Sequence, residues 1–284
     1  MPNAEITPIL FGMSAAILWG AADFTGGLGS RRGNLYRVVF TGEWIGLLVL
    51  LPLPFIFNEP LPHAGDLILA GLASLIGVIG IIYLYRALAE GQMSVAAPVS
   101  GLLAAVIPVL VSTWTEGFPG IIKLGGFLLA LGSIWLISSG EGIGSTLKLR
   151  WAALRLPVQA AIAFGLYFVL MHAASQEATF WPLVSARLGG IITLLFYVLR
   201  KHQALTPPHR VWPLAALCGV LDVLANTMYV LAGQAGRLDM AAVLGSLYPG
   251  VTVALAWLLL KERINRLQVI GIFAALVAIT LIAL

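Results

Sequence analysis

The chain has 284 residues, of which 60% are hydrophobic and only 10% are charged, with a mean hydropathy of +0.98. Ordinary soluble domains carry about 25% charged residues, so this composition excludes a soluble globular fold and indicates an integral membrane protein. The net charge of +4 predicts no nucleic-acid partner, because basic residues in such a chain are first of all topology signals. The single cysteine, Cys218, cannot form an intrachain disulfide.

A membrane-spanning helix needs roughly 20 mostly apolar residues. Along the chain this criterion predicts ten spans, at residues 6–28, 35–57, 66–88, 94–114, 120–139, 154–175, 180–199, 211–234, 239–260 and 265–284. Most links between them are short and contain Gly, Pro, Asn or charged residues. The polar linker at 140–153 divides one membrane domain into a first five-helix repeat, residues 1–139, and a second, residues 154–284.

The two halves resemble each other at a constant offset of 145 residues. AILWG at 16–20 aligns with AIAFG at 161–165, and GFLLALGSIWLI at 126–137 aligns with GIFAALVAITLI at 271–282. Because five is an odd number, the second copy must enter the membrane in the opposite direction to the first. The expected fold class is therefore an all-α membrane protein of two inverted five-helix repeats, an arrangement that many secondary transporters use for alternating access.

The basic residues predict the orientation of this fold. Thirteen lie in or beside the links after spans one, three, five, seven and nine, two lie on the opposite side, and Arg187 lies within a span. By the positive-inside rule, the basic side faces the cytoplasm, and both termini lie on the non-cytoplasmic side of the cell (inner) membrane. The thirteen are Arg31, Arg32, Arg37, Arg86, Lys148, Arg150, Arg155, Arg200, Lys201, Arg210, Lys261, Arg263 and Arg266, and the two are Lys123 and Arg237.

With this repeat, the chain resembles the drug/metabolite transporter (DMT) superfamily, in its ten-helix EamA-like branch. The resemblance covers nearly the whole length and includes the Trp-Gly step at 19–20 and the stretch LAEGQMSVAAPVSGLLAAVIPVL at 88–110. The counterpart of that stretch, residues 235–263, ends in the Glu-Arg pair typical of the family at 262–263. The first half departs from the pattern, because it reads TEGF at 115–118 where a second Glu-Arg ending is expected.

The resemblance implies a basket of ten helices around a central cavity lined mainly by helices one, three, four, six, eight and nine. It also implies transport of amino acids, other metabolites, choline-like cations or drugs. The chain contains no CxxC, HExxH, GxSxG or Walker A motif, so we expect no enzyme activity, no cofactor and no metal site. Without an ATP site, transport must run down a gradient or use an ion or exchange partner.

Ionisable residues inside spans are costly, so they usually face a cavity or a partner. Trp19 and Asp23 are four residues apart and share a helix face, where they could hold a cationic group. Alternatively, Trp19 lies at the membrane interface and Asp23 caps the Gly-Gly turn at 26–27. Glu43 and Arg187 occupy nearly equivalent positions in the two copies, which predicts either a structural ion pair or a role in substrate binding or coupling.

Two further stripes at helical spacing are candidates for the cavity wall. Asp222, Asn226 and Tyr229 form the first, for which helix–helix hydrogen bonding is the alternative. Phe164, Phe168 and His172 form the second, and His172 is either a proton relay or a packing residue. The remaining candidates for substrate binding are Tyr83, Ser100, Ser246 and Tyr248.

These observations predict a secondary active or facilitative transporter, an exporter of small metabolites such as amino acids. The alternatives are a quaternary-ammonium or multidrug cation transporter with proton antiport, and a non-transporting membrane scaffold. The expected partners are a small-molecule substrate, protons and the lipid bilayer, with the chain acting as a monomer or a dimer. A carboxylate that binds a proton and a cationic substrate in turn would give antiport, and Asp23, Asp222 and Glu43 are the candidates for it.

Overall fold

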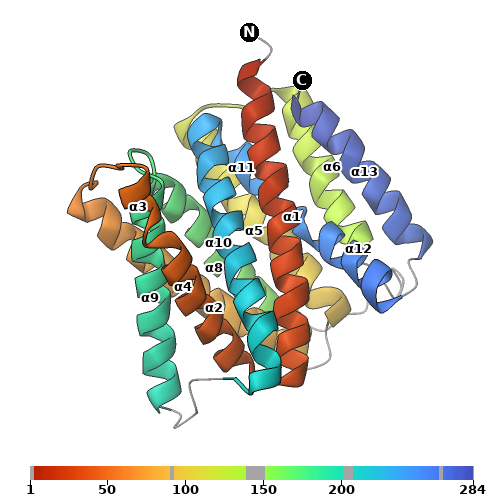
Figure 1. The fold of residues 1–284 in the computed structure, drawn as a ribbon. Coiled ribbons are helices and arrows are strands. Elements are labelled where there is room, and N and C mark those ends of the chain that lie inside the picture. Colours follow the sequence, from red (N-terminus) through yellow and green to blue (C-terminus); the bar gives the residue numbers. More distant parts are fainter. Residues whose placement is uncertain (1–2, 90–92, 139–150, 201–206, 262–264, 284) are drawn as a thin grey trace.

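The computed structural model describes residues 3–89, 93–138, 151–200, 207–261 and 265–283, and within them every regular element is a helix (Figure 1). The first half contains α1 (Asn3–Arg32), α2 (Leu35–Leu50), α3 (Leu53–Ile56), α4 (Ala64–Ala89), α5 (Met93–Thr115) and α6 (Ile121–Ser138). The second half contains α8 (Trp151–Ala174), α9 (Phe180–Arg200), the 3-10 helix η1 (His209–Val211), α10 (Trp212–Ala235), α11 (Leu238–Gly245), α12 (Tyr248–Leu260) and α13 (Arg266–Ala283).

Every predicted span coincides with one helix or with two consecutive helices. Seven of these segments are long and apolar enough to cross a membrane. The described parts of the other three, Ser100–Thr115, Ile121–Leu136 and Arg266–Ile282, are apolar but shorter, so a total of ten spans stays a prediction. Most of the linker at 140–153 and the Glu-Arg pair at 262–263 lie outside the described residues.

Two of the expected spans are interrupted near a proline. The span at 35–57 divides into α2 and α3 next to Pro52, and the span at 239–260 divides into α11 and α12 next to Pro249. Proline has no backbone N–H and clashes with the preceding turn, so a helix bends or stops where it occurs. The second interruption has a functional consequence, because it lies beside the central cavity.

The two halves run in opposite directions through the molecule. Helices α2 and α9 are equivalent in the repeat, and they pack side by side. Tyr36 at the start of α2 contacts Tyr197 near the end of α9, with ring centroids 4.6 Å apart. Further along α2, Glu43 meets Arg187, which lies earlier in α9. The equivalent helices α2 and α9 are therefore antiparallel, as the inverted repeat requires.

The halves are intertwined, because most helix packing joins one half to the other. Helix α1 packs on α10, α11 and α12, and α2 packs on α10; we call these five helices lobe A. Helix α8 packs on α4 and α5, and α9 packs on α4; we call these four helices lobe B. The last helices of the halves, α6 and α13, pair with each other at one edge of the molecule (right side of Figure 1). Each lobe therefore contains helices from both halves.

Two glycine pairs allow this close packing between the halves. A Cβ on Gly219 of α10 would lie 2.7 Å from the Cα of Gly42 on α2. A Cβ on Gly189 of α9 would lie 3.0 Å from the Cα of Gly71 on α4. Each pair joins the second helix of one half to the third helix of the other, so the two contacts are related by the repeat. Small residues let the two backbones approach closely, and the resulting van der Waals packing holds helices together in lipid, where there is no hydrophobic driving force between them.

We expect Gly219→Ala to destabilise the protein by about 1–3 kcal/mol, because the new methyl group would press on the backbone of α2. The measurement is the midpoint of thermal unfolding in detergent, followed by size-exclusion chromatography. The matched control is Gly132→Ala on α6, where a Cβ meets nothing within 4 Å and should leave stability unchanged or slightly higher. Equal midpoints for the two variants would contradict the close contact between α2 and α10.

Candidate functional site

A cavity of about 170 Å3 lies at the centre of the molecule, between the lobes. Lobe A contributes side chains from α1, α2, α10 and the junction of α11 with α12, and lobe B contributes side chains from α4, α5, α8 and α9. Most of the predicted site residues line it, namely Trp19, Asp23, Glu43, Phe164, Phe168, Arg187, Asp222, Asn226, Ser246 and Tyr248. The resemblance implied a central cavity lined mainly by helices one, three, four, six, eight and nine, and the structure adds α2 and α9 to this lining. The repeat predicted a site between the two copies, whereas the cavity lies between lobes that each contain helices from both halves.

One wall of the cavity carries a cluster of charges, which we call the charge cluster: Glu43, Arg187 and Asp222. The Arg187 guanidinium donates one hydrogen bond to a Glu43 carboxylate oxygen at 3.0 Å and another to a carboxylate oxygen of Asp222. The Arg187 side chain is only 8% exposed and that of Glu43 9% exposed. Because Arg187 belongs to lobe B and both carboxylates belong to lobe A, the charge cluster joins the lobes.

A chain of hydrogen bonds extends the charge cluster along the cavity. The Asn226 amide nitrogen donates to the carboxylate of Asp222 at 3.1 Å and to its backbone carbonyl at 2.7 Å. The Tyr167 hydroxyl on α8 then donates to the Asn226 side-chain oxygen at 2.5 Å. These bonds hold Asp222 and Asn226 in place and use the donors of Asn226. They support both readings of the Asp222 stripe, since the residues line the cavity and also join helices.

Asp23 differs from the other two carboxylates of the cavity. Among the described residues, no side chain or backbone group donates a hydrogen bond to the Asp23 carboxylate or forms an ion pair with it. Helix α1 continues through Gly26 and Gly27 to Arg32, so there is no turn at that point for Asp23 to cap. Two carboxylates share one guanidinium in the charge cluster, and Asp23 adds a third. With all four groups ionised, the cavity has an excess of two negative charges.

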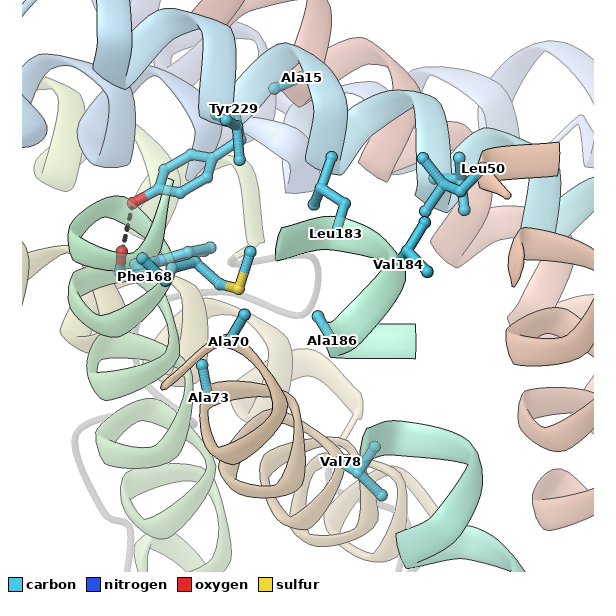
Figure 2. Packing of buried hydrophobic residues seen from close by; sticks show 14 of the residues in the cluster. Ala15, Leu50, Ala70, Ala73, Val78, Phe168, Leu183, Val184, Ala186 and Tyr229 are labelled. Atoms are coloured by element: carbon cyan, nitrogen blue, oxygen red, sulfur yellow. Dashed lines mark hydrogen bonds between the residues drawn. The ribbon is translucent and has the colours of Figure 1, made fainter. Parts of the chain in front are cut away.

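Four aromatic side chains from the two lobes pack together, and we call them the aromatic cluster: Trp19, Tyr167, Phe168 and Tyr229. The Trp19 ring centroid lies 5.5 Å from that of Phe168 and 5.6 Å from that of Tyr229. The Phe168 and Tyr229 centroids are 4.9 Å apart, and the Tyr229 hydroxyl donates to the Phe168 carbonyl at 3.0 Å (Figure 2). Tyr229 is 1% exposed and lies behind the cavity wall rather than on it.

The aromatic cluster closes the cavity on the side away from the basic links. Helix α10 begins on the basic side, and its residues between 218 and 226 line the cavity before Tyr229 is reached. Helix α8 runs in the same direction, with cavity-lining residues from 164 to 168 followed by the fully buried Met171. Residues 238–244, beyond the cluster, are all buried. The cavity therefore lies on the basic side of the aromatic cluster.

Three further predicted site residues do not reach the cavity. Ser100 is fully buried, and its hydroxyl donates to the Pro157 carbonyl at 3.1 Å, which joins α5 to α8. His172 lies against α10, where a Cβ on Gly233 would be 2.6 Å from the imidazole Nδ1. Tyr83 packs in a separate small cluster around Leu84 and Ala160. These three positions are places of helix packing in the structure.

The cavity also contains polar residues that sequence reasoning did not select, above all Tyr167, Cys218 and Ser74. Tyr167 directly precedes Phe168, so it does not belong to the residues spaced by four that include Phe164 and Phe168, and it was not predicted. Cys218 lies one helical turn before Asp222, and the same spacing could have placed it on the stripe of Asp222 and Asn226. In the described part of the chain, no group of three or more His, Cys, Asp or Glu residues could hold a metal ion.

Comparisons with known proteins agree with this architecture. The model of the EamA-like transporter family matches residues 6–139 and again residues 152–284. An uncharacterized protein of Methanocaldococcus jannaschii is 24% identical over 132 residues, which cover 96% of that protein and 46% of this chain. One solved crystal structure superposes with a TM-score of 0.78 over 98% of both chains at 16% identity, which indicates the same fold.

The contacts within the charge cluster predict which of its neutral variants loses the most stability. Arg187→Gln should be the most harmful single change, with a loss of about 3–5 kcal/mol, because it leaves the buried carboxylate of Glu43 and the partly exposed carboxylate of Asp222 without their shared countercharge. Glu43→Gln should cost less, since Arg187 keeps Asp222 as its partner. The double variant Glu43→Gln/Arg187→Gln should recover part of the loss of Arg187→Gln. Thermal unfolding of the purified proteins measures all three.

Arg200→Gln is the matched control for these variants, since Arg200 is exposed at the end of α9. It should leave the unfolding midpoint within the error of the wild type. If the losses of Glu43→Gln and Arg187→Gln simply add in the double variant, the two residues are not coupled and the charge cluster does not hold the lobes together.

Proposed function

The chain belongs to the EamA-like transporter family and is a multi-pass membrane transporter of the drug/metabolite type, and we propose that it exports small metabolites with a cationic amino group, such as amino acids. The observation that carries this proposal is the Asp23 carboxylate, which lines the cavity without a partner among the described residues. Members of this family are transporters rather than enzymes.

The charge balance of the cavity supports a cationic group on the substrate. Glu43 and Asp222 already share Arg187, whereas Asp23 has no ion-pair partner in the part of the chain that the structure describes. A carboxylate in a site of low dielectric is stabilised by an ammonium group or by a proton. The faces of Trp19 and Phe168 also attract a cation through their ring electrons. Asp23 together with these rings is the element that we propose for recognition of the amino group.

Competition at Asp23 supplies a mechanism for coupling. A proton and an ammonium group both need the same negative charge, so only one of them can occupy Asp23 at a time. Binding of the substrate on one side would release the proton, and binding of a proton on the other side would release the substrate. This exchange gives antiport, and a cavity on the basic, cytoplasmic side suits loading of a substrate for export.

The packing of the helices suggests which parts of the protein move as rigid units during transport. Lobes A and B meet along α2 with α9 and along α11 with α5, and the cavity lies between them. We propose that the lobes rock against each other, which would open the cavity to one side of the membrane at a time. Because each lobe takes helices from both halves, the moving bodies in this mechanism are the lobes rather than the two repeats.

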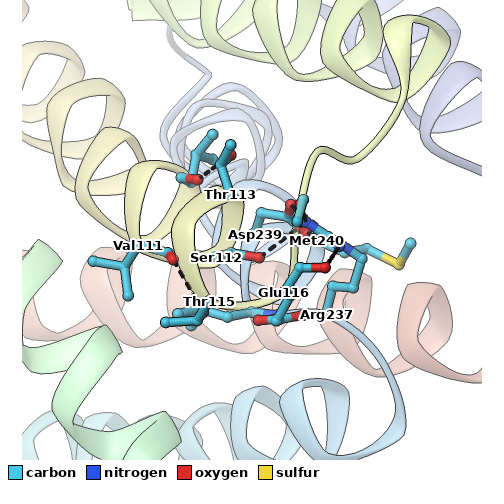
Figure 3. A network of polar contacts seen from close by, with 11 residues as sticks. Val111, Ser112, Thr113, Thr115, Glu116, Arg237, Asp239 and Met240 are labelled. Atoms are coloured by element: carbon cyan, nitrogen blue, oxygen red, sulfur yellow. Dashed lines mark hydrogen bonds and ion pairs between the residues drawn. The ribbon is translucent and has the colours of Figure 1, made fainter.

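A second network joins the lobes on the side opposite to the cavity, and we call it the latch (Figure 3). Arg237, just before α11, donates hydrogen bonds to the Ser112 hydroxyl at 3.2 Å, the Glu116 carbonyl at 3.2 Å and the Gly117 carbonyl at 2.8 Å. It also pairs with the fully buried Asp239 at 2.8 Å. The hydrogen bond to Asp239 raises the pKa of Arg237, so the latch stays charged.

For the location, we propose the cell (inner) membrane with both termini on the non-cytoplasmic side. The two ends of the chain lie on the same side of the molecule (Figure 1), as an even number of spans requires. The latch would then face outward and the cavity would face the cytoplasm.

A quaternary-ammonium or multidrug cation transporter with proton antiport is the second candidate. The same excess of negative charge and the aromatic walls favour it, because both attract a permanent cation. The two candidates differ in whether the cation donates hydrogen bonds.

Neutralising Asp23 should separate coupling from the rest of transport. In proteoliposomes loaded with an amine substrate, a pH gradient should accelerate transport by the wild type and have no effect on Asp23→Asn. The variant should also bind the cation at least about tenfold more weakly, since the charge-assisted contact is lost. The matched control is Asp66→Asn in the first turn of α4, outside the cavity. Unchanged proton coupling in Asp23→Asn would contradict the antiport mechanism.

Breaking the latch should open the cavity to the opposite side. Cys218 is the single cysteine and lines the cavity, so a membrane-impermeant cationic methanethiosulfonate reports its accessibility from each side of oriented vesicles. The wild type should react from the basic side. Arg237→Ala should increase the rate from the opposite side by about tenfold, because several charge-assisted hydrogen bonds are lost.

Arg210→Ala, an exposed arginine on the basic side, is the control for this labelling and should leave both rates unchanged. Cys218→Ser should abolish labelling from both sides. If Arg237→Ala reacts from the opposite side no faster than the wild type, the latch does not hold the cavity closed.

A further inference from the structure

We propose that Asp23 and Ser246 together bind a primary or secondary ammonium group, and that this pair selects such amines against quaternary ammonium ions. The inference rests on the proposed transport of a cationic substrate and identifies the chemistry of its charged end. Both residues line the same cavity, Asp23 from α1 and Ser246 from the junction between α11 and α12.

Among the described residues, the hydroxyls of Ser30, Ser175 and Ser246 are buried without a hydrogen-bond partner, and of these three Ser246 alone lines the cavity. The side chain is 1% exposed, and its oxygen has no hydrogen-bond partner among the described residues. Ser133 and Ser112 are equally buried, but the Ser133 hydroxyl donates to the Ala130 carbonyl at 2.6 Å and the Ser112 hydroxyl accepts from Arg237. Leaving a buried hydroxyl unsatisfied is unfavourable, and this cost is removed when a ligand in the cavity bonds to it.

The backbone beside Ser246 contributes a further hydrogen-bond acceptor that lacks a donor. Helix α11 ends at Gly245 and α12 begins at Tyr248, followed by Pro249. Because Pro249 has no N–H, the Gly245 carbonyl lacks the donor that it would have in a continuous helix. Interrupted helices in transporters use such free carbonyls to bind cationic groups. Gly245 also contacts Trp19, since a Cβ at this position would lie 2.9 Å from the Trp19 ring.

The part of the cavity lined by Asp23 and Ser246 therefore offers hydrogen-bond acceptors to a ligand. The Asp23 carboxylate has two oxygens, and the Ser246 hydroxyl oxygen has lone pairs that no described group uses. A primary ammonium carries three N–H donors and can bond to several of these oxygens at once, while a quaternary ammonium carries none. A quaternary ion would gain charge attraction and contact with Trp19, but it would leave the Ser246 hydroxyl unsatisfied.

The other acids of the cavity do not offer the same site. Glu43 and Asp222 each bond to Arg187, and Asp222 also accepts from Asn226. An ammonium at that wall would compete with a guanidinium that is already held in place, and it would meet the positive charge of Arg187. The amino group therefore binds at Asp23 and Ser246, and the remainder of the substrate extends toward the aromatic cluster.

The test compares two probes that share one carbon skeleton and one positive charge, and in the second probe a methyl group replaces each N–H donor. Phenethylammonium and N,N,N-trimethylphenethylammonium are titrated calorimetrically into the purified full-length protein in detergent. The wild type should bind phenethylammonium at least about tenfold more tightly than the trimethyl probe. Ser246→Ala should remove most of this preference by weakening phenethylammonium alone, by about tenfold, as expected for a hydrogen bond to a charged group.

Ser133→Ala is the matched control, since Ser133 is equally buried but lies on α6 away from the cavity. It should leave both affinities unchanged. Ser246→Ala should keep or slightly raise the thermal stability, because the hydroxyl that it removes is buried and has no partner among the described residues. Should Ser246→Ala fail to fold, Ser246→Cys keeps nearly the same size and should show the same loss of preference.

Three results would overturn the inference. If the wild type binds both probes equally, the site does not select for N–H donors, although the proposed cationic substrate would stand. If Ser246→Ala weakens both probes to the same extent, Ser246 shapes the cavity and does not bond to the amine. If neither probe binds, both the inference and the proposed class of substrate are wrong.

Discussion

A guanidinium shared by two carboxylates is the interaction on which the centre of this molecule depends. Arg187 comes from lobe B, while Glu43 and Asp222 come from lobe A, and all three lie at the cavity between the lobes. In a medium of low dielectric, none of these charges is stable without the others. The charge cluster therefore fixes contacts among α2, α9 and α10, and Asp23 is the cavity carboxylate outside this cluster.

The charge cluster and the aromatic cluster form walls of the cavity between the lobes, and the latch is a separate contact between the lobes. The charge cluster and the aromatic cluster each take side chains from both lobes, so a displacement of one lobe changes both walls together. The latch lies beyond the aromatic cluster and joins α5 to the start of α11. Alternating access by movement of the lobes would therefore rearrange both clusters, whereas Asp23 and Ser246, which both belong to lobe A, would move together.

The positions of the helices could be predicted from the sequence, because a long apolar segment is a local property. Spacing by four residues likewise placed Trp19 with Asp23 and Asp222 with Asn226 on the cavity wall, since it reports which side chains share a helix face. Spacing does not report which neighbour that face meets. Two features could therefore not be predicted from spacing. Tyr229 lies behind the cavity wall, and Arg187 bonds to Asp222 on the next helix of the second half.

The separation of Glu43 and Arg187 along the chain has a consequence for synthesis in the membrane. The two residues are 144 positions apart, so a ribosome that adds roughly 5–20 residues per second delivers the arginine about 7–30 seconds after the glutamate. During that interval, α2 carries an acid without its countercharge, and α1 and α2 have not yet met α10. We therefore expect the first two helices to reach their final depth and tilt only after α9 and α10 have emerged.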